Sequence, residues 1–256
     1  MKKLIIAEKP SLARNIGSAL NVRINKEGYM ENEKYIVSWA FGHLFELRDV
    51  DGYVGEKRKW SEVRLPFFPE KFEFDLKNDS GIKKQYKVLK NLINSKEVDE
   101  IVNAGDADRE GQIIVDIIIN AIKTDKKIKR LWLPEQTEET IRKAINNLED
   151  NFKYRNLHNE GLARTYMDWL MGINLTRYIS LKANMLFPVG RVLIPVIKHI
   201  YDKDLAIKNF IPEKYFTIES ETMCNGTLLK LICDKKYNLL ELEKAKSYSY
   251  ELNRNK

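Results

Sequence analysis

The chain has 256 residues, 43% apolar and 32% charged, a composition that can bury a core and excludes a disordered chain. No apolar run reaches the roughly 20 residues of a membrane-spanning helix, and the N-terminal apolar run is too short for a signal peptide. The formal net charge is +7, and the two cysteines, Cys224 and Cys233, form neither a disulfide framework nor a four-thiolate zinc site. We therefore expect a globular protein of the reducing cytoplasm, without a membrane partner.

The first 150 residues alternate between short apolar runs and runs with helical spacing. Pro10 ends the first apolar run, and Ser11 is placed to cap the helix that follows. Residues 52–69, rich in Gly, Pro, charge and aromatic rings, predict a long ordered loop. Strands alternating with helices predict a mostly parallel sheet with helices on both faces. In chain order, we expect strands at residues 4–7, 35–39, 100–103 and 131–133, and helices at 12–20, 83–94, 111–122 and 138–148.

The next part of the chain is predicted to be helical, with helices at residues 157–181 and 192–207. Residues 151–210 hold nine Lys or Arg against four Asp or Glu, together with aromatic side chains such as Trp169. Basic groups interleaved with aromatic rings suit a phosphate backbone with stackable bases. The alternative is a lysine-rich chain with solvated surfaces, which the net charge alone would favour.

The C-terminal part of the chain turns to β structure. Residues 215–233 contain two strand-like runs joined by Asn225-Gly226, which is a strong signal for a two-residue hairpin. Residues 241–256 are charged and polar, and we expect them to be frayed. The pattern predicts the opening of a sheet whose remainder lies outside this chain.

Three acids stand at alternate positions where an apolar strand ends and a helix begins: Asp106, Asp108 and Glu110. Side chains two apart on an extended chain project the same way, so Asp106 and Asp108 can face one point. Like charges so close repel each other unless a cation lies between them, and hard oxygen ligands suit Mg²⁺. The alternative is a solvated acidic turn that caps the helix.

Glu8 and Lys9 stand at the end of the first strand and the start of the first helix. In an open α/β sheet, ligands gather at the carboxyl ends of the strands, and a helix N-terminus there favours anions. Glu8 should therefore lie at the same edge as Asp106. A glutamate, a lysine and an acid cluster together predict a phosphoryl-transfer site.

Successive motifs along the chain resemble those of bacterial topoisomerase III, a type IA DNA topoisomerase. The resemblance implies a Rossmann-like Toprim domain over residues 1–150, a helical DNA-binding region over 151–211, and the start of a β-rich arch over 212–256. Its motifs occur in family order over nearly the whole chain, at residues 7–11 (AEKPS), 39–44 (WAFGHL), 105–112 (GDADREGQ), 162–164 (LAR), 168–170 (DWL), 172–177 (GINLTR), 189–192 (VGRV) and 209–212 (NFIP).

The resemblance also implies roles for the acids and their basic neighbours. Glu8 would manage the proton on the DNA 3′-oxygen, and Lys9 would stabilise charge on the scissile phosphate. The alternative for Lys9 is a solvated surface lysine. Arg109 is a further catalytic candidate, which we expect to pair with the acids and hold their geometry. The implied Mg²⁺ ligands are Glu8, Asp106, Asp108 and Glu110.

The implied partner is DNA, preferentially single-stranded, in the cytoplasm and associated with the nucleoid, and no protein partner can be inferred. A tryptophan can stack on bases, although Trp169 on an amphipathic helix could equally be a core residue. Arg164 and Asp168 lie four apart and could form only an ion pair. His43 is expected to be structural. The implied DNA contacts are Trp60, Arg164, Asp168, Trp169, Arg177, Pro188, Val189, Gly190, Arg191, Val192 and Leu193.

The chain departs from the family pattern in two places. The motif that ends at Val192 continues with Leu193 and Ile194 where the family has glutamine and threonine, and Pro188 replaces a small polar residue. None of the twelve tyrosines has the Tyr-x-Arg-Thr context of the family's nucleophile. We therefore expect the N-terminal part of a type IA topoisomerase without its nucleophile. The alternatives are a stand-alone Toprim nuclease or primase-like enzyme, and a catalytically dead remnant that binds single-stranded DNA.

Overall fold

The computed structural model describes residues 1–55 and 59–254, and the chain divides into two units, Met1–Leu193 and Ile194–Lys256. The domain boundaries expected after residues 150 and 211 remain predictions. Within the described ranges, no helix is both long and apolar enough to cross a membrane.

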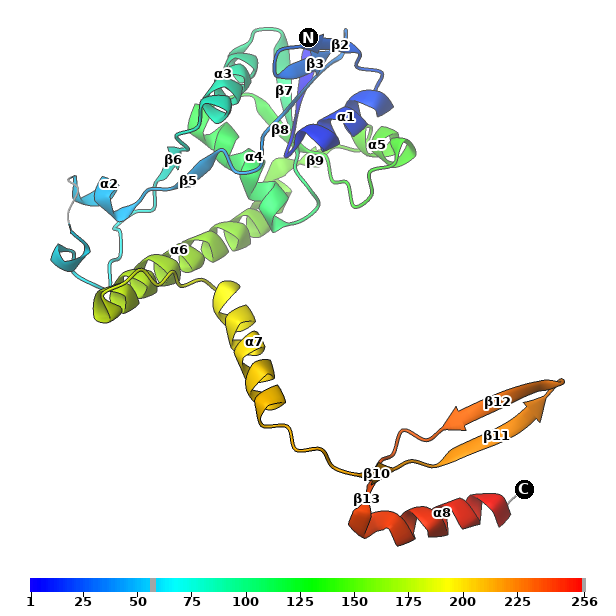
Figure 1. The fold of residues 1–256 in the computed structure, drawn as a ribbon. Coiled ribbons are helices and arrows are strands. Elements are labelled where there is room, and N and C mark those ends of the chain that lie inside the picture. Colours follow the sequence, from blue (N-terminus) through cyan, green and yellow to red (C-terminus); the bar gives the residue numbers. More distant parts are fainter. Residues whose placement is uncertain (56–58, 255–256) are drawn as a thin grey trace. The chain divides into compact units, whose positions relative to one another are not determined.

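A seven-stranded sheet with the order β2-β3-β4-β1-β7-β8-β9 forms the centre of the first unit (Figure 1). Its four central strands are parallel, while β2, β3 and β9 add antiparallel pairs at the two edges. The mostly parallel α/β sheet expected from the sequence is thus confirmed. The strands are β1 (Lys2–Ala7), β2 (Ile24–Lys26), β3 (Tyr29–Glu31), β4 (Tyr35–Trp39), β7 (Val98–Ala104), β8 (Lys127–Arg130) and β9 (Glu149–Asp150).

Helices cover both faces of this sheet because the central strands are apolar on both sides (Figure 1). In β1, Leu4 and Ile6 belong to one apolar cluster and Ile5 and Ala7 to the other, as alternation along a strand requires. Burying a leucine or isoleucine side chain of this strand contributes about 1.5–3 kcal/mol to the stability of the fold. The first cluster lies under α3 (Ser80–Asn94) and α4 (Arg109–Ile122), and the second under α1 (Pro10–Ala19) and α5 (Glu138–Ile145).

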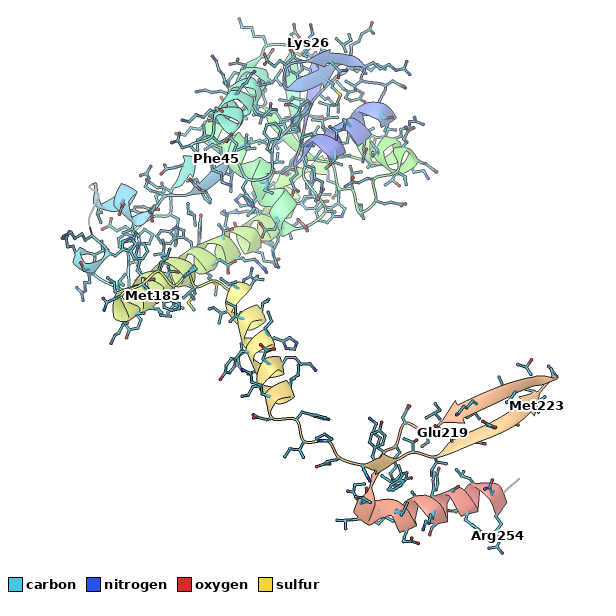
Figure 2. The ribbon with its side chains drawn as sticks, viewed as in Figure 1. Lys26, Phe45, Met185, Glu219, Met223 and Arg254 are labelled. Carbon is cyan, nitrogen blue, oxygen red and sulfur yellow. The ribbon has the colours of Figure 1, made fainter. Side chains whose placement is uncertain are left out.

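A long segment leaves the sheet after β4 and packs along helix α6 (Figure 1). The segment begins at Phe45, which is labelled in Figure 2. Its first strand, β5, pairs with its last strand, β6. The side chain of Asn174 on α6 accepts the backbone N–H of Phe67 at 2.6 Å and donates to its carbonyl at 3.0 Å. The elements are β5 (Phe45–Leu47), α2 (Val50–Val54), the 3-10 turn η1 (Trp60–Glu62), β6 (Phe74–Leu76) and α6 (Arg155–Ala183). A second 3-10 turn, η2 (Asn151–Tyr154), precedes α6.

The second unit contains the predicted hairpin. Asn225 and Gly226 both have positive φ, 48° and 78°, as a two-residue turn of this hand requires. The side chains on both faces of the hairpin are exposed. Two of them, Glu219 and Met223, are labelled in Figure 2. The elements are α7 (Leu193–Lys208), β10 (Tyr215–Phe216), β11 (Glu219–Cys224), β12 (Thr227–Ile232), β13 (Tyr237–Asn238), the 3-10 turn η3 (Leu239–Glu241) and α8 (Leu242–Arg254).

Some local predictions were wrong. Pro10 does not merely end the strand: it opens α1, where its missing N–H is harmless, so Lys9 is the N-cap instead of Ser11. The strand expected at 131–133 lies at 127–130, because alternating lysines hide its apolar face while Leu131 and Leu133 are buried beyond its end.

Two segments are more ordered than expected. The loop expected at 52–69 overlaps α2 and contains η1, and residues 56–58 of it lie outside the described residues. The tail expected to be frayed forms α8, a mostly polar helix whose Ala245 is buried.

Candidate active site

The ends of β1 and β7 bring Glu8 and Asp106 together. These strands are parallel neighbours with Ala7 opposite Ala104, so the residues that follow emerge side by side. Glu8 Oε2 accepts the backbone N–H of Asp106 at 3.2 Å, and Lys9 Nζ donates to Asp106 Oδ2 at 2.5 Å. The first-strand glutamate and an aspartate 98 positions later thus meet at one sheet edge.

The electrostatics of this edge suit proton transfer. Burial raises the pKa of the Glu8 carboxyl, the N–H of Asp106 opposes that rise, and the nearby charge of Asp106 adds to it. The hydrogen bond to Asp106 raises the pKa of Lys9, which keeps its ammonium charged. A carboxyl with a raised pKa in an open edge is a suitable group to exchange protons with a substrate.

Two oxygens at this edge have the chemistry that Mg²⁺ prefers. Asp106 Oδ1 is buried and has no hydrogen-bond partner among the described residues, and Glu8 Oε2 lies 3.2 Å from the backbone nitrogen of the same aspartate. Mg²⁺ is usually held by one or two carboxylates, with waters and substrate phosphate as the other ligands. Glu8 and Asp106 therefore fit such an ion. No group of three or more His, Cys, Asp or Glu side chains in the described ranges is arranged to hold a metal.

The other two acids of the predicted set lie in different surroundings. Asp108 Oδ1 accepts the backbone N–H of Gly111 at 2.7 Å, so this side chain caps helix α4. Glu110 Oε2 lies 3.4 Å from Nε2 of His43. Because successive side chains on a helix diverge by about 100°, residues after Asp108 cannot all face one ion. Metal-ligand roles for Asp108 and Glu110 remain predictions.

Arg109 does not pair with the acid cluster. Its Nη1 donates to Glu160 Oε1 on α6 at 2.6 Å, because the first turn of α4 directs it toward that helix. We expected Arg109 to pair with the acids and hold their geometry, and this prediction is wrong because its partner is Glu160. A catalytic role for Arg109 stays a prediction.

Two glycines let the loop of the acids pack backbone against backbone. A Cβ on Gly105 would lie 1.9 Å from the carbonyl oxygen of Gly111, and one on Gly111 would lie 2.3 Å from the backbone nitrogen of Asp106. Both distances are far inside contact, so only glycine fits at these positions. This close approach presses the start of α4 against the residue that carries the candidate metal ligand.

Three of the expected DNA contacts are packed within the protein. The Trp169 ring meets Tyr53, Phe67 and Phe72 edge to face, with centroids 6.0–6.3 Å apart. Arg177 is 2% exposed, and its guanidinium lies 5.3 Å from the centroid of the Trp60 ring. These side chains fasten the segment between β5 and β6 to α6. A DNA contact by any of the three stays a prediction.

A groove that Glu110 lines collects other members of the predicted set. Arg191 Nη2 lies 3.0 Å from Asp168 Oδ2, and Arg164 Nε lies 4.0 Å from the same oxygen. The expected ion pair between Arg164 and Asp168 is therefore present, with Arg191 as a closer third member. The other residues that line the groove are His43, Phe45, Glu46, Leu47, Phe74, Lys77, Glu110, Ile117 and Thr165.

The segment after α6 is held by two hydroxyls of that helix, and the first, Ser180 Oγ, accepts the backbone N–H of Phe187 at 2.9 Å. Thr176 Oγ1 accepts the backbone N–H of Val189 at 2.8 Å, which fixes this turn against the helix. A Cβ on Gly190 would meet no atom of the described residues within 4 Å, so there is open space at that position. The remaining predicted contacts of this segment are exposed: Pro188, Val192 and Leu193.

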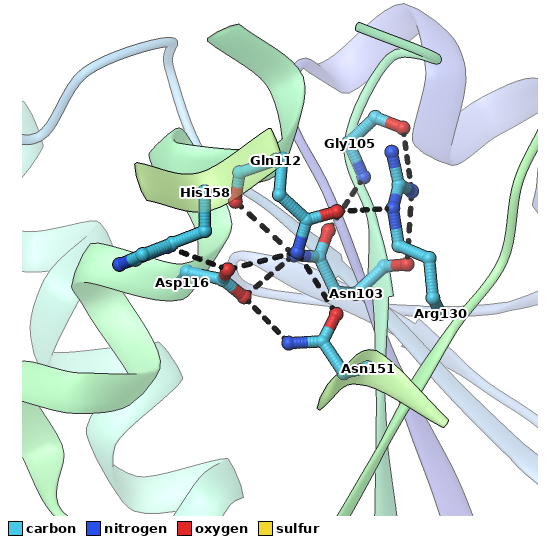
Figure 3. Close-up of polar contacts among 7 residues, drawn as sticks. All are labelled: Asn103, Gly105, Gln112, Asp116, Arg130, Asn151 and His158. Atoms are coloured by element: carbon cyan, nitrogen blue, oxygen red, sulfur yellow. Dashed lines mark hydrogen bonds and ion pairs between the residues drawn. The ribbon is translucent and has the colours of Figure 1, made fainter. Parts of the chain in front are cut away.

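Sequence reasoning missed a buried polar network behind Asp106, drawn in Figure 3. Arg130, Gln112 and Asp116 form its centre, all of them buried, and Asn103, Asn151 and His158 complete it. The only available signal was a set of polar residues inside strongly apolar elements.

Comparisons with known proteins match both parts of the chain. The family model described as Toprim domain matches residues 3–136, and that described as DNA topoisomerase matches residues 153–256. DNA topoisomerase 3 of Staphylococcus haemolyticus is 35% identical over 241 residues, covering 94% of this chain and 33% of the relative. DNA topoisomerase 3 of Bacillus cereus is 38% identical over 222 residues, covering 87% of this chain and 30% of the relative. The chain thus spans about a third of the length of these curated relatives.

A solved structure shares the fold. Full-length topoisomerase I from Thermotoga maritima aligns with a TM-score of 0.57 and 22% sequence identity, covering 94% of this chain and 37% of that one. This likeness supports the order of the α/β domain and the helical region that follows it.

Proposed function

The chain belongs to the type IA DNA topoisomerases, as a topoisomerase III-like N-terminal region with a Toprim domain, and on that premise we propose that it carries the phosphotransfer centre for cleaving and rejoining one DNA strand. The observation that carries the proposal is the meeting of Glu8, Lys9 and Asp106 at one sheet edge. A carboxylate pair with a lysine beside it is what phosphodiester chemistry requires.

Each residue at this edge has a chemical role in the proposal. Glu8 and Asp106 hold Mg²⁺, which supplies positive charge for the scissile phosphate when bound. Glu8, whose pKa burial raises, would give a proton to the DNA 3′-oxygen as that oxygen leaves the phosphate, and would take it back when the strand is rejoined. Lys9 shields the carboxylate of Asp106 and presents its charge to the phosphate. Asp108 and Glu110 complete the acidic surroundings.

Single-stranded DNA is the proposed substrate, which also implies a location with the nucleoid. The groove that Glu110 lines holds three cations, Lys77, Arg164 and Arg191, and the ring of Phe74, groups that can meet phosphates and bases, although Glu46, Glu110 and Asp168 balance their charge. The space beside the Cα of Gly190 leaves room for a strand to approach. The contacts proposed for Pro188, Val192 and Leu193 belong to this same approach.

The covalent step needs a tyrosine that this chain does not supply in the family's context. None of its twelve tyrosines stands in a Tyr-x-Arg-Thr sequence. We therefore expect the chain to bind divalent cations and single-stranded DNA without relaxing a supercoiled plasmid by itself. Relaxation by the purified chain would contradict the assignment of a missing nucleophile.

The test is Mg²⁺-dependent binding of a fluorescent single-stranded oligonucleotide, followed by anisotropy. Glu8→Gln and Asp106→Asn should abolish the Mg²⁺ dependence, while the matched control Asp125→Asn, an exposed acid outside the site, should keep it. Metal-dependent cleavage or primer synthesis that Asp106→Asn abolishes would instead support a stand-alone Toprim nuclease or primase. A remnant that only binds DNA would be unaffected by both site variants.

A further inference from the structure

Arg130, at the end of β8, is a buried arginine to which no carboxylate of the described residues is directly bonded. It is 1% exposed, yet its guanidinium donates to backbone carbonyls and to one amide oxygen. Buried charges are normally paired with an opposite charge, so this arrangement calls for a reason. Its acceptors are the carbonyls of Asn103 (3.2 Å), Gly105 (2.9 Å), Asp106 (2.7 Å) and Leu131 (2.8 Å), and Gln112 Oε1 (2.7 Å).

Three of these carbonyls belong to the stretch that presents Asp106. The rigid fork of a guanidinium can bond several carbonyls in fixed directions, which an ammonium cannot. Arg130 holds the carbonyl of Asp106 from one side, while Glu8 holds its N–H from the other. Both peptide groups of Asp106 are thereby fixed, and so is the direction in which its carboxylate leaves the backbone.

The positive charge of Arg130 is balanced by Asp116, which contacts it through one intervening side chain (Figure 3). Gln112 bridges them, since its Oε1 accepts from Arg130 and its Nε2 donates to Asp116 Oδ2 at 2.8 Å. Asp116 stays an anion because hydrogen bonds outweigh burial: burial raises its pKa, but donors from His158, Gln112, Asn151 and Asn103 bring that pKa below its usual value. The carbonyls of Gly105 and Asp106 therefore accept hydrogen bonds from a positively charged group. The carboxylate that balances this charge is bonded to Gln112 and does not take up the donors of Arg130.

Two aromatic rings close the site of the guanidinium. Trp132 and Tyr154 stack with centroids 5.1 Å apart, and the guanidinium carbon lies 4.9 Å and 5.7 Å from their respective centroids. Burial lowers the pKa of Arg130 to about 10, so it is charged at neutral pH. Attraction between a cation and ring faces strengthens where water is excluded.

We propose that Arg130 is a positioning residue for the candidate metal site: its guanidinium fixes the backbone of Gly105 and Asp106, and so sets the carboxylate of Asp106 against Glu8. The inference rests on the proposed function, since it assumes that these two carboxylates hold a divalent cation. Arg130 itself touches neither the cation nor the DNA.

The experiment is Mn²⁺ binding to the full chain, by calorimetry and by the EPR signal of free Mn²⁺, alongside thermal unfolding. Arg130→Lys keeps the charge but loses the fork, and it should weaken Mn²⁺ binding by about tenfold or more, as for other residues that orient metal ligands. The matched control is Arg142→Lys, because Arg142 also donates to a backbone carbonyl, that of Ala19, away from the loop. It should leave Mn²⁺ affinity within about twofold.

The outcomes separate the two proposals. If Mn²⁺ binds and Glu8→Gln abolishes binding, the metal site stands, and unchanged affinity in folded Arg130→Lys overturns the positioning role alone. If the unaltered chain binds no Mn²⁺, the proposed function fails, and the positioning role with it. A merely structural arginine would lower the unfolding temperature without changing the affinity.

A second measurement needs no variant and decides the matter if Arg130→Lys does not fold. In the unaltered protein, the Nε–Hε resonance of Arg130 and the amide resonance of Asp106 should shift together as Mg²⁺ is added, with the same midpoint. An Arg130 resonance that stays fixed while the Asp106 amide titrates to saturation would overturn the proposal.

Discussion

Helix α6 makes two different kinds of contact along its length. In its first turns, His158 Nδ1 lies 2.9 Å from the buried carboxylate of Asp116, inside the polar network behind Asp106. Farther along, Tyr166 stacks on Phe72 with centroids 4.0 Å apart, and Trp169 meets Phe72 and two more rings edge to face. The first contact consists of directional hydrogen bonds, and the second consists of packed aromatic rings.

The two contacts should respond differently to substitution. Hydrogen bonds around a buried charge fix directions, because each donor must match an acceptor and a lost partner leaves a buried polar group unsatisfied. Aromatic packing contributes mainly through buried area and is less dependent on direction. We infer that the polar contact sets the geometry of the candidate active site, whereas the aromatic contact sets the stability of the segment between β5 and β6.

The largest effect on stability is expected at the aromatic contact. Trp169→Ala removes a ring that touches Tyr53, Phe67 and Phe72, and should lower the free energy of unfolding by about 3 kcal/mol. Its Mn²⁺ affinity should stay unchanged. Urea denaturation and Mn²⁺ calorimetry measure the two effects, with Tyr178→Ala, an exposed ring on the same helix, as the control. A large drop in Mn²⁺ affinity would break the division between the two contacts.

At the polar contact, Asp116→Asn should destabilise the fold by about 2 kcal/mol at neutral pH, because an amide places its own N–H groups against donors. The difference from the unaltered protein depends on pH. Since the pKa of folded Asp116 is below the ordinary value of 3.8, its contribution to stability is fully present above pH 3.8 and is lost as pH falls through the lower folded pKa.

Denaturation curves at pH 7 and near pH 3 check this prediction. The difference in the free energy of unfolding between Asp116→Asn and the unaltered protein should be smaller near pH 3 than at pH 7. A gap that stays constant, or widens on acidification, would mean that Asp116 is not the stabilised anion described above.

A smaller loss is expected at Asn174, which holds the segment between β5 and β6 by its backbone. Asn174→Ala removes the two hydrogen bonds to Phe67 and should lower the free energy of unfolding by about 1–2 kcal/mol. Hydrogen exchange should quicken at the amide of Phe67 and not in the sheet. The control is Asn15→Ala, an exposed asparagine whose side chain bonds the Gln136 side chain at the surface. Equal exchange in both variants would contradict the assigned anchor.

The smallest effect on stability, but a defined one on binding, is expected at Lys9. Its ion pair with Asp106 is partly exposed, so Lys9→Met should change the free energy of unfolding by no more than about 0.5 kcal/mol. Mn²⁺ should bind about threefold tighter, because the ammonium no longer competes for Asp106 Oδ2 or repels the ion. Weaker binding in this variant would show that Lys9 organises the acids instead of competing with the cation.

The fold was predictable where periodicity was strong. Parallel strands with apolar runs on both faces, and the long apolar helix that follows the acids, emerge from residue spacing alone. The meeting of Glu8 and Asp106 was predictable too, because carboxyl ends of neighbouring parallel strands share one edge.

What sequence reasoning missed depends on contacts between distant residues. Arg130 reads as one more charge in an alternating Lys-Ile-Lys-Arg strand, and only the fold shows that its acceptors come from a loop 24 and 25 positions away. Asn174 lies 107 positions from Phe67, so no local pattern relates them. The aromatic surroundings of Trp169 likewise come from a segment about a hundred residues earlier.

The central claim is that Glu8 and Asp106 share one divalent cation, and a double-mutant cycle on Mn²⁺ affinity tests it most directly. We predict that Glu8→Gln and Asp106→Asn each weaken binding by at least about tenfold, and that the double variant is hardly worse than the weaker single one. Two losses that simply add, or no loss in either variant, would contradict the account.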